Sequence, residues 1–194
     1  MIDTFLWILA RVTGLGAATA LAISLLTGLA LRSALLDWLT TNRALRSTHE
    51  FTAILWIPLG LLHMAFLVLD GSVRTPIRLV DLVVPFKVAY GTFAIGLGTL
   101  TFDIFVVVAI TGWLRRQIHA ATWRWIHRLA YAGCALLFLH AVLGGSDFSA
   151  PQVSAIAWSV AVILAILSLA RILWGRLSAE GRELRRESPS PDRG

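Results

Sequence analysis

The feature that most constrains this chain is a series of five long apolar runs separated by short polar segments. A helix needs about twenty predominantly apolar residues to cross the hydrocarbon core of a bilayer. Because that core offers no water to the backbone, runs of this length predict an all-α integral membrane protein, a five-helix transmembrane bundle. The predicted spans are residues 5–31, 51–69, 88–114, 129–146 and 152–173.

The charged residues predict how the spans are oriented. Of the 194 residues, 57% are hydrophobic and only 14% charged, which excludes a soluble globular protein. The net charge of +6 comes mostly from arginines beside the ends of the apolar runs, a pattern of membrane topology and not of nucleic-acid binding. By the positive-inside rule, the N-terminus lies outside and the C-terminus is cytoplasmic, and we expect a bacterial cytoplasmic membrane. The arginines behind this assignment are Arg32, Arg43, Arg46, Arg115, Arg116, Arg124, Arg128 and those from Arg171 onward.

The sequence divides into two parts, a transmembrane domain over residues 1–174 and a polar tail over residues 175–194 that we expect to be disordered. The first run is too long for a signal peptide and lacks a cleavage site, so we retain it as a helix. The longest outer loop, residues 70–87, is predicted to lie along the membrane surface as a lid. A single cysteine, Cys134, excludes an intramolecular disulfide and a cysteine zinc site.

Four of the five histidines fall in the second and fourth helices, which run in the same direction. His49 and His63 are fourteen residues apart, and His127 and His140 are thirteen apart, which correspond to roughly 21 and 19.5 Å along a helix. Two pairs at matching heights result, His49 with His127 and His63 with His140. Facing imidazoles can bind the two axial positions of an iron porphyrin, so the spacing predicts two haems between these helices, non-covalent and of b type. An isolated histidine that hydrogen-bonds a neighbouring helix is the ordinary alternative.

The directions in which the histidines point around each helix fit this pairing less well than their heights. At 100° per residue His63 lies about 40° from His49, whereas His140 lies about 140° from His127. We therefore predict that the fourth helix is overwound into a 3₁₀ stretch, or that His127 lies in a non-ideal first turn.

Nearby residues are candidates for contacts with the haems. Arg46 and Arg124 each stand one turn before a histidine and are predicted to meet the inner propionates, with membrane anchoring as the alternative. Arg11, inside the first run, is assigned to an outer propionate, with snorkelling as the alternative. Gly14 and Gly28 are predicted to let the porphyrins approach the first helix, although small-residue helix packing explains them nearly as well.

The remaining candidates have ordinary explanations. His119, in a short inner loop, is expected to be solvated, and Asp103, in mid-helix, is a candidate for a proton path. Trp123 and several other tryptophans lie near span ends, where an interfacial aromatic belt accounts for them.

The histidine spacings and their context resemble the ferric reductase-like transmembrane domain. That superfamily includes the membrane part of NADPH oxidases and the haem subunit of bacterial methionine sulfoxide reductase systems, and the similarity covers roughly residues 5–174. The motifs that carry it are His49/His63, Trp123-Arg124-x-x-His127-Arg128-x-x-Tyr131, His140, Trp7-x-x-x-Arg11-x-x-Gly14-Leu15, and the stretch from Pro85-Phe86 to Asp103.

The resemblance implies transmembrane electron transfer through two bis-histidine b-type haems. The chain has five predicted spans where the full oxidases have six, and no flavin or nicotinamide site is expected in it. We therefore expect a haem-binding membrane subunit that takes electrons from a separate cytoplasmic flavoprotein reductase or from quinol, and passes them to an outer-side acceptor. Two other hypotheses stay open, a proton or ion transporter that uses the histidines and Asp103, and a haem-free membrane anchor for a soluble enzyme.

Overall fold

The computed structural model describes residues 2–31, 40–70, 77–88 and 91–187. These residues form helices without any strand, and five helices are long and apolar enough to cross a membrane. The predicted all-α fold with five spans is confirmed. The helices are α1 (Ile2–Ala30), α2 (Asn42–Leu69), α3 (Thr92–Trp113), α4 (Ala120–Gly144) and α5 (Pro151–Glu187), with short 3₁₀ turns η1 (Leu79–Leu82) and η2 (Ser146–Ser149).

Two helices begin well before the apolar runs that predicted them. α2 starts at Asn42, where the Thr41 hydroxyl accepts a hydrogen bond from the backbone N–H of Ala44 at 3.3 Å, and α4 starts at Ala120. Hydropathy locates the hydrocarbon core, whereas a helix continues until its backbone groups find other partners. As a result, His49 and His127 both lie well inside regular helices.

α5 continues to Glu187, beyond the end of the predicted span at residue 173, and the disorder of the tail stays a prediction. The segment from 175 to 187 is rich in Arg, Glu and Leu, which are strong helix formers. The part of α5 that is apolar enough to span a membrane ends at Leu173. Residues 188–194 lie outside the described part of the chain.

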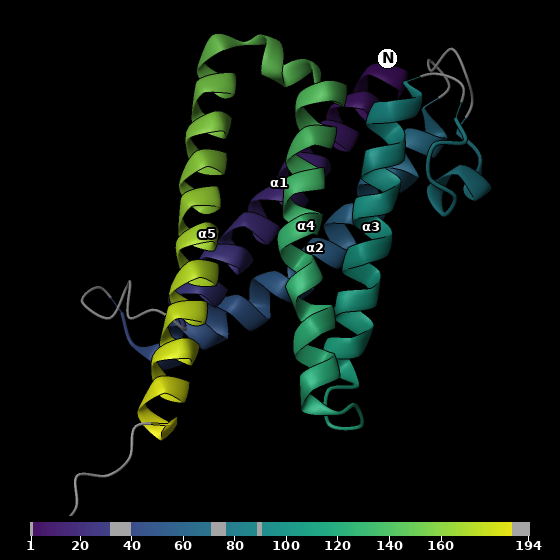
Figure 1. The fold of residues 1–194 in the computed structure, drawn as a ribbon. Coiled ribbons are helices and arrows are strands. Elements are labelled where there is room, and N and C mark those ends of the chain that lie inside the picture. Colours follow the sequence, from purple (N-terminus) through teal and green to yellow (C-terminus); the bar gives the residue numbers. More distant parts are fainter. Residues whose placement is uncertain (1, 32–39, 71–76, 89–90, 188–194) are drawn as a thin grey trace, which may run out of the picture.

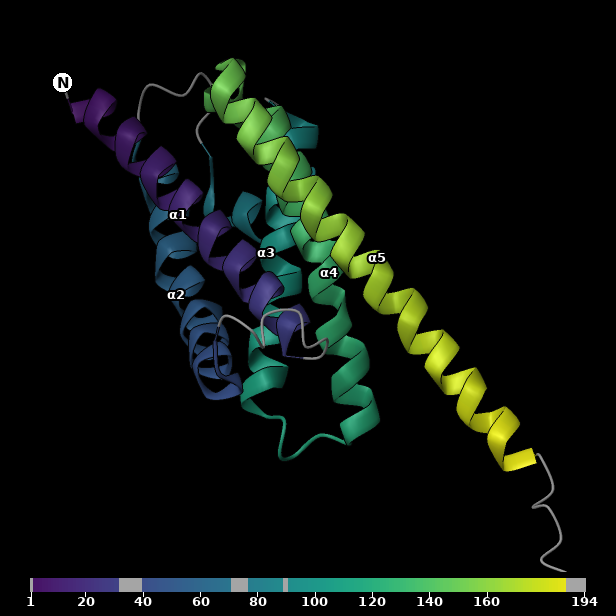
Figure 2. The ribbon, with the colours of Figure 1, turned by 90° about the vertical axis from the view of Figure 1, so that its left-hand side faces the viewer.

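The first four helices form two antiparallel hairpins. α1 packs along α2 and α3 along α4, whereas contacts between the two hairpins are few. In Figure 1, α1 and α2 run obliquely behind α4 and α3, so the hairpins form two crossed layers. Figure 2 shows α5 at the side of this bundle, contacting it mainly near its own N-terminus. There Trp158 packs edge-on against Phe138 of α4, with 4.8 Å between ring centroids.

The core between the layers is centred on Trp56. This side chain is only 5% exposed and lies seven residues from both His49 and His63 on α2. Its ring centroid is 5.6 Å from that of Phe105 and 6.0 Å from that of Phe102, both on α3. α1 completes the cluster with Ala20 and Leu21. An aromatic layer therefore separates the two histidine levels.

The loop that we predicted to be a lid is docked along the side of α3 over its described part, residues 77–88 (Figure 1). Thr99 donates its hydroxyl proton to the backbone carbonyl of Asp81 at 3.1 Å. Phe86 has a positive φ of 62°, and its ring covers Gly96, where a Cβ would lie 2.2 Å from a ring carbon. These contacts hold the segment beside the helix, and its role as a lid stays a prediction.

We predict that Trp56→Ala lowers the free energy of unfolding by about 3 kcal/mol, because it empties the middle of the core. Trp113→Ala is the matched control, since Trp113 is 84% exposed, and we expect a change within about 0.5 kcal/mol. Both can be measured by unfolding in mixed detergent micelles. Equal losses at the two positions would contradict the packing role assigned to Trp56.

Candidate functional site

The structure brings the four histidines of the second and fourth helices together in the two predicted pairs. The rings of His49 and His127 have centroids 6.2 Å apart and planes at 79°. The rings of His63 and His140 have centroids 6.4 Å apart and planes at 77°. The helices α2 and α4 themselves pack mainly on their hairpin partners, so the imidazoles meet across the boundary between the two layers.

Three of the four imidazoles bind a backbone carbonyl of the partner helix in their own hairpin. The Nδ1 atom of His63 lies 2.7 Å from the carbonyl oxygen of Ala10, and that of His140 lies 2.8 Å from the carbonyl oxygen of Ala94. The Nδ1 atom of His49 lies 2.8 Å from the carbonyl oxygen of Ser24 and 3.2 Å from its hydroxyl. A carbonyl only accepts, so Nδ1 carries the proton in all three, and Nε2 holds the lone pair that binds a metal.

A glycine lies four residues after each of these carbonyls and gives the imidazole its space. A Cβ at Gly14 would lie 2.8 Å from Nδ1 of His63, and one at Gly98 would lie 2.7 Å from Nδ1 of His140. A Cβ at Gly28 would lie 3.1 Å from Cε1 of His49. The sequence singled out Gly14 and Gly28 as places for a porphyrin to approach, but what lies against them is an imidazole.

Gly98 is a residue of the site that the sequence did not single out. The signal that points to it is spacing. Gly98 and Gly112 are fourteen residues apart on α3, as Gly14 and Gly28 are on α1. The two hairpins thus share a repeated arrangement of glycine and histidine that the sequence analysis did not find.

His127 is the exception to this arrangement. Nothing lies within 4 Å of a Cβ built at Gly112, so no histidine is docked there. α4 is α-helical throughout, so the predicted 3₁₀ stretch and the predicted non-ideal first turn are both wrong. The thirteen-residue step turns His127 about 140° from His140, which faces α3. Because α2 crosses obliquely behind α4 (Figure 1), imidazoles on different sides of α4 still reach α2 at its two ends.

Trp123 supports His127 from within α4. Their rings are stacked, with centroids 5.1 Å apart and planes at 19°. The indole Nε1 of Trp123 is buried and has no hydrogen-bond partner among the described residues. An aromatic belt residue would place this N–H at the headgroups, so the belt interpretation does not fit Trp123. Its position one turn before His127 was the available signal.

Each pair offers two protein ligands, which suits an iron porphyrin better than a bare ion. A metal–imidazole bond is about 2 Å long, as for zinc, and with roughly 1.1 Å from nitrogen to centroid, two bonds on one axis separate the centroids by about 6.2 Å. The observed separations of 6.2 and 6.4 Å match this value. Over the described ranges, no three His, Cys, Asp or Glu side chains gather to hold a metal ion. A macrocycle that needs only two axial ligands therefore fits the donor set.

Arg11 has a partner that the sequence did not suggest. Its Nε donates to Oδ2 of Asp147 at 2.8 Å, and its Nη2 pairs with Oδ1 of the same carboxylate. The guanidinium also lies over the ring of Trp7, 4.1 Å from the centroid. This bidentate ion pair joins α1 to the link between α4 and α5, and the contact of Arg11 with a haem propionate stays a prediction.

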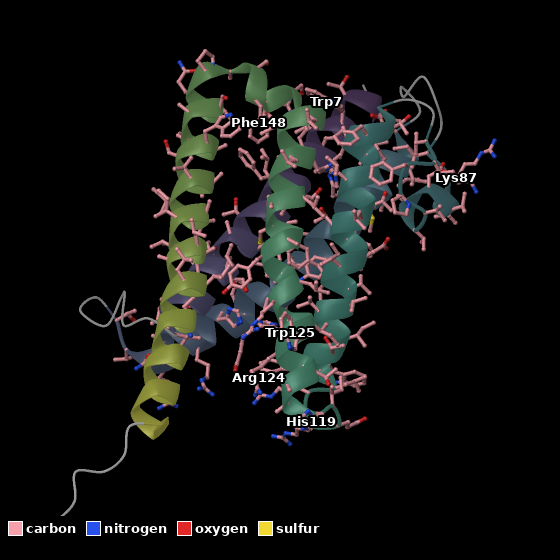
Figure 3. All side chains as sticks on the ribbon, viewed as in Figure 1. Trp7, Lys87, His119, Arg124, Trp125 and Phe148 are labelled. Carbon is pink, nitrogen blue, oxygen red and sulfur yellow. The ribbon has the colours of Figure 1, made fainter. Side chains whose placement is uncertain are left out.

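The other predicted basic residues lie at the opposite end of the bundle from Trp7 and Phe148. Arg124 is exposed there, with His119 at the N-cap of α4 (Figure 3). Arg46 is also exposed and lies one turn before His49 on α2. Both arginines are on the helices that supply the 49/127 pair, as predicted, and their contact with propionates stays a prediction.

Asp103 does not join either pair. It is half-buried on α3 and makes no hydrogen bond or ion pair with the residues described. The transporter hypothesis, which uses Asp103 and the histidines, stays open.

Comparison with known proteins adds no relative. No family model matches the chain, and no curated protein matches it at a significant level. The resemblance to the ferric reductase-like domain thus depends on the motifs alone.

We predict that Gly98→Ala and Gly14→Ala each destabilise the protein by about 1–2 kcal/mol, because the added Cβ displaces an imidazole from its carbonyl. Gly112→Ala is the control in the same helix. Its new Cβ meets nothing, so we expect a gain of up to about 1 kcal/mol from helix propensity. Thermal unfolding of the three variants in one detergent tests this, and a stabilised Gly98→Ala protein would contradict it.

We also predict that Arg11 and Asp147 are coupled by about 1 kcal/mol, because the pair is bidentate but its side chains are 31% and 22% exposed. A double-mutant cycle with Arg11→Gln and Asp147→Asn measures this term. Strictly additive effects on the free energy of unfolding would show that the pair contributes nothing.

Proposed function

We propose that this protein carries electrons across a membrane through two b-type haems, one held by His63 and His140 and the other by His49 and His127. The proposal depends on one observation above all. Two imidazole pairs, at different levels of one bundle, have the centroid separation that two axial ligands of one iron require.

The hydrogen bonds of the imidazoles support the same assignment. A histidine that ligates a metal usually donates its other N–H to a carbonyl or carboxylate, which fixes the tautomer and the ring orientation. His49, His63 and His140 do so through Nδ1. The glycines let the rings lie against the helices, so the ligand positions are set by backbone geometry and not by flexible side chains.

When bound, each haem supplies an iron that accepts and releases one electron. The residues of this chain hold the ligand nitrogens in place, keep water out and fill the space between the two levels. Trp56 lies seven residues, roughly 10 Å along the helix, from both His49 and His63. Its buried ring therefore occupies the route between the two pairs.

The direction of transfer follows from the predicted topology. With the N-terminus outside, the 49/127 pair lies toward the cytoplasm and the 63/140 pair toward the outside. We propose that a cytoplasmic flavoprotein or quinol reduces the first site, with Arg46 and Arg124 beside the haem carboxylates, and that an acceptor is reduced at the second. Arg11 lies on the side of the 63/140 pair, where it pairs with Asp147.

The purified protein, from cells supplied with haem, should show a reducible b-type spectrum with close to two haems per chain. We predict that the double variant His63→Ala/His140→Ala retains close to one haem, because both changes fall in one pair. The double variant His63→Ala/His127→Ala should retain none, because it breaks both pairs. Haem content per chain and the reduced-minus-oxidised spectrum measure the outcome.

His119→Ala is the matched control, since His119 is exposed at the end of α4 and should leave both haems in place. A colourless wild-type protein would overturn the proposal and favour a haem-free anchor or a transporter. If His63→Ala/His127→Ala kept one haem, the pairing would be wrong even though haem binds.

A further inference from the structure

The described segment 77–88 packs against α3 at the same depth as one histidine pair. Asp81 accepts the hydrogen bond of Thr99, the residue after Gly98, and Gly98 lies against His140. Thr99 is seven residues into α3, roughly 10 Å from its N-terminus. The segment therefore descends alongside a membrane span to the level of the 63/140 pair.

The side of this segment that faces away from α3 is apolar. Ile77, Asp81 and Val88 are buried against the bundle. In contrast, five apolar side chains of the segment are exposed, namely Leu79, Val80, Val83, Val84 and Phe86. Phe86 also contacts Phe93, which is 63% exposed on the first turn of α3, with 6.2 Å between ring centroids. The apolar surface of the segment thus continues onto the apolar surface of a spanning helix.

Protein groups bind several polar groups of the segment, and its two basic side chains lie near its ends. The Asp81 carboxylate accepts from the backbone N–H of Arg78 at 2.9 Å, and the backbone N–H groups of Asp81, Val83 and Val84 bond within η1 and its flanks. Arg78 and Lys87, both exposed, bracket the apolar stretch, and Lys87 points away from the bundle (Figure 3). Non-helical backbone at membrane depth is tolerated only where protein satisfies it, and long basic side chains reach headgroups from within the bilayer.

We propose that residues 78–87 form a re-entrant segment that inserts into one leaflet of the bilayer. The exposed apolar side chains lie among the acyl chains, and Arg78 and Lys87 lie at the headgroup phosphates. The occupant of this surface is lipid, because the surface is continuous with α3 and lies below the end of that helix. This inference does not depend on haem binding.

The test places a nitroxide label at one cysteine of the full-length chain in vesicles of phosphatidylcholine and phosphatidylglycerol. Cys134→Ala removes the native thiol, and Val83→Cys adds a new one at a side chain that is 65% exposed. Collisions with oxygen, which concentrates in lipid, and with a water-soluble nickel chelate then report the depth of the label. Val107→Cys on α3 is the lipid-facing control, and Ser146→Cys in η2 is the control at the surface.

We expect the label at 83 to match that at 107, with at least a fivefold higher ratio of oxygen to nickel collisions than at 146. A ratio equal to that at 146 would place the segment in water and overturn the proposal. Low collision rates with both reagents would also overturn it, because they would mean that protein, such as a second copy of this chain, covers the surface. Leu79→Cys repeats the measurement if the Val83→Cys protein does not fold.

Discussion

The arrangement of this bundle depends on the contact between an imidazole and the backbone of a neighbouring helix. A histidine inside a membrane protein must satisfy its N–H, and here a carbonyl on the partner helix accepts it in three cases. Those carbonyls lie inside helices, and two of them, Ala10 and Ser24, also accept a hydrogen bond from a threonine hydroxyl. The imidazole reaches that position only where the next turn carries a glycine. The glycine and the carbonyl together set the distance and register between the two helices of a hairpin.

This contact also explains why the hairpins differ. In an antiparallel pair, residues that face each other have a constant sum of sequence numbers, and Gly14 with His63 gives the same sum as Gly28 with His49. In the second hairpin, Gly98 and His140 face each other in the same way. Because His127 is only thirteen residues before His140, whereas Gly112 is fourteen after Gly98, His127 is displaced by one residue from the position that faces Gly112. One residue is about 100° of rotation, which no side chain can undo. His127 stacks on Trp123, and the oblique crossing of the layers brings it to His49.

Much of the fold and part of the site could be predicted from the sequence. Five spans follow from hydropathy because the bilayer imposes a length, and the pairing of His49 with His127 and His63 with His140 follows from depth alone. Depth does not determine the direction in which a side chain points around its helix axis. Ideal helical geometry placed His127 and His140 on different sides and so suggested a distorted α4, whereas in the structure α4 is regular and the tilt between the helices brings both imidazoles to α2. The partner of Arg11 was equally out of reach, because Asp147 is distant in sequence and the contact depends on how α4 turns into α5. Gly98 was within reach, through its spacing to Gly112.

The environment of the 63/140 pair shows how these constraints combine. One side of α3 between Ala94 and Thr99 supports His140 through a carbonyl and a glycine, and another binds segment 77–88 through Thr99 and Gly96. Two glycines in this stretch, Gly96 and Gly98, each admit a ring, and a side chain at either position would force that ring away. The ion pair between Arg11 and Asp147 also links the two layers beside this histidine pair. Arg11 directly follows Ala10, whose carbonyl binds His63, and Asp147 follows His140 by seven residues. The geometry of this pair is thus fixed from both layers, and a change in either layer alters the distance between the two imidazoles.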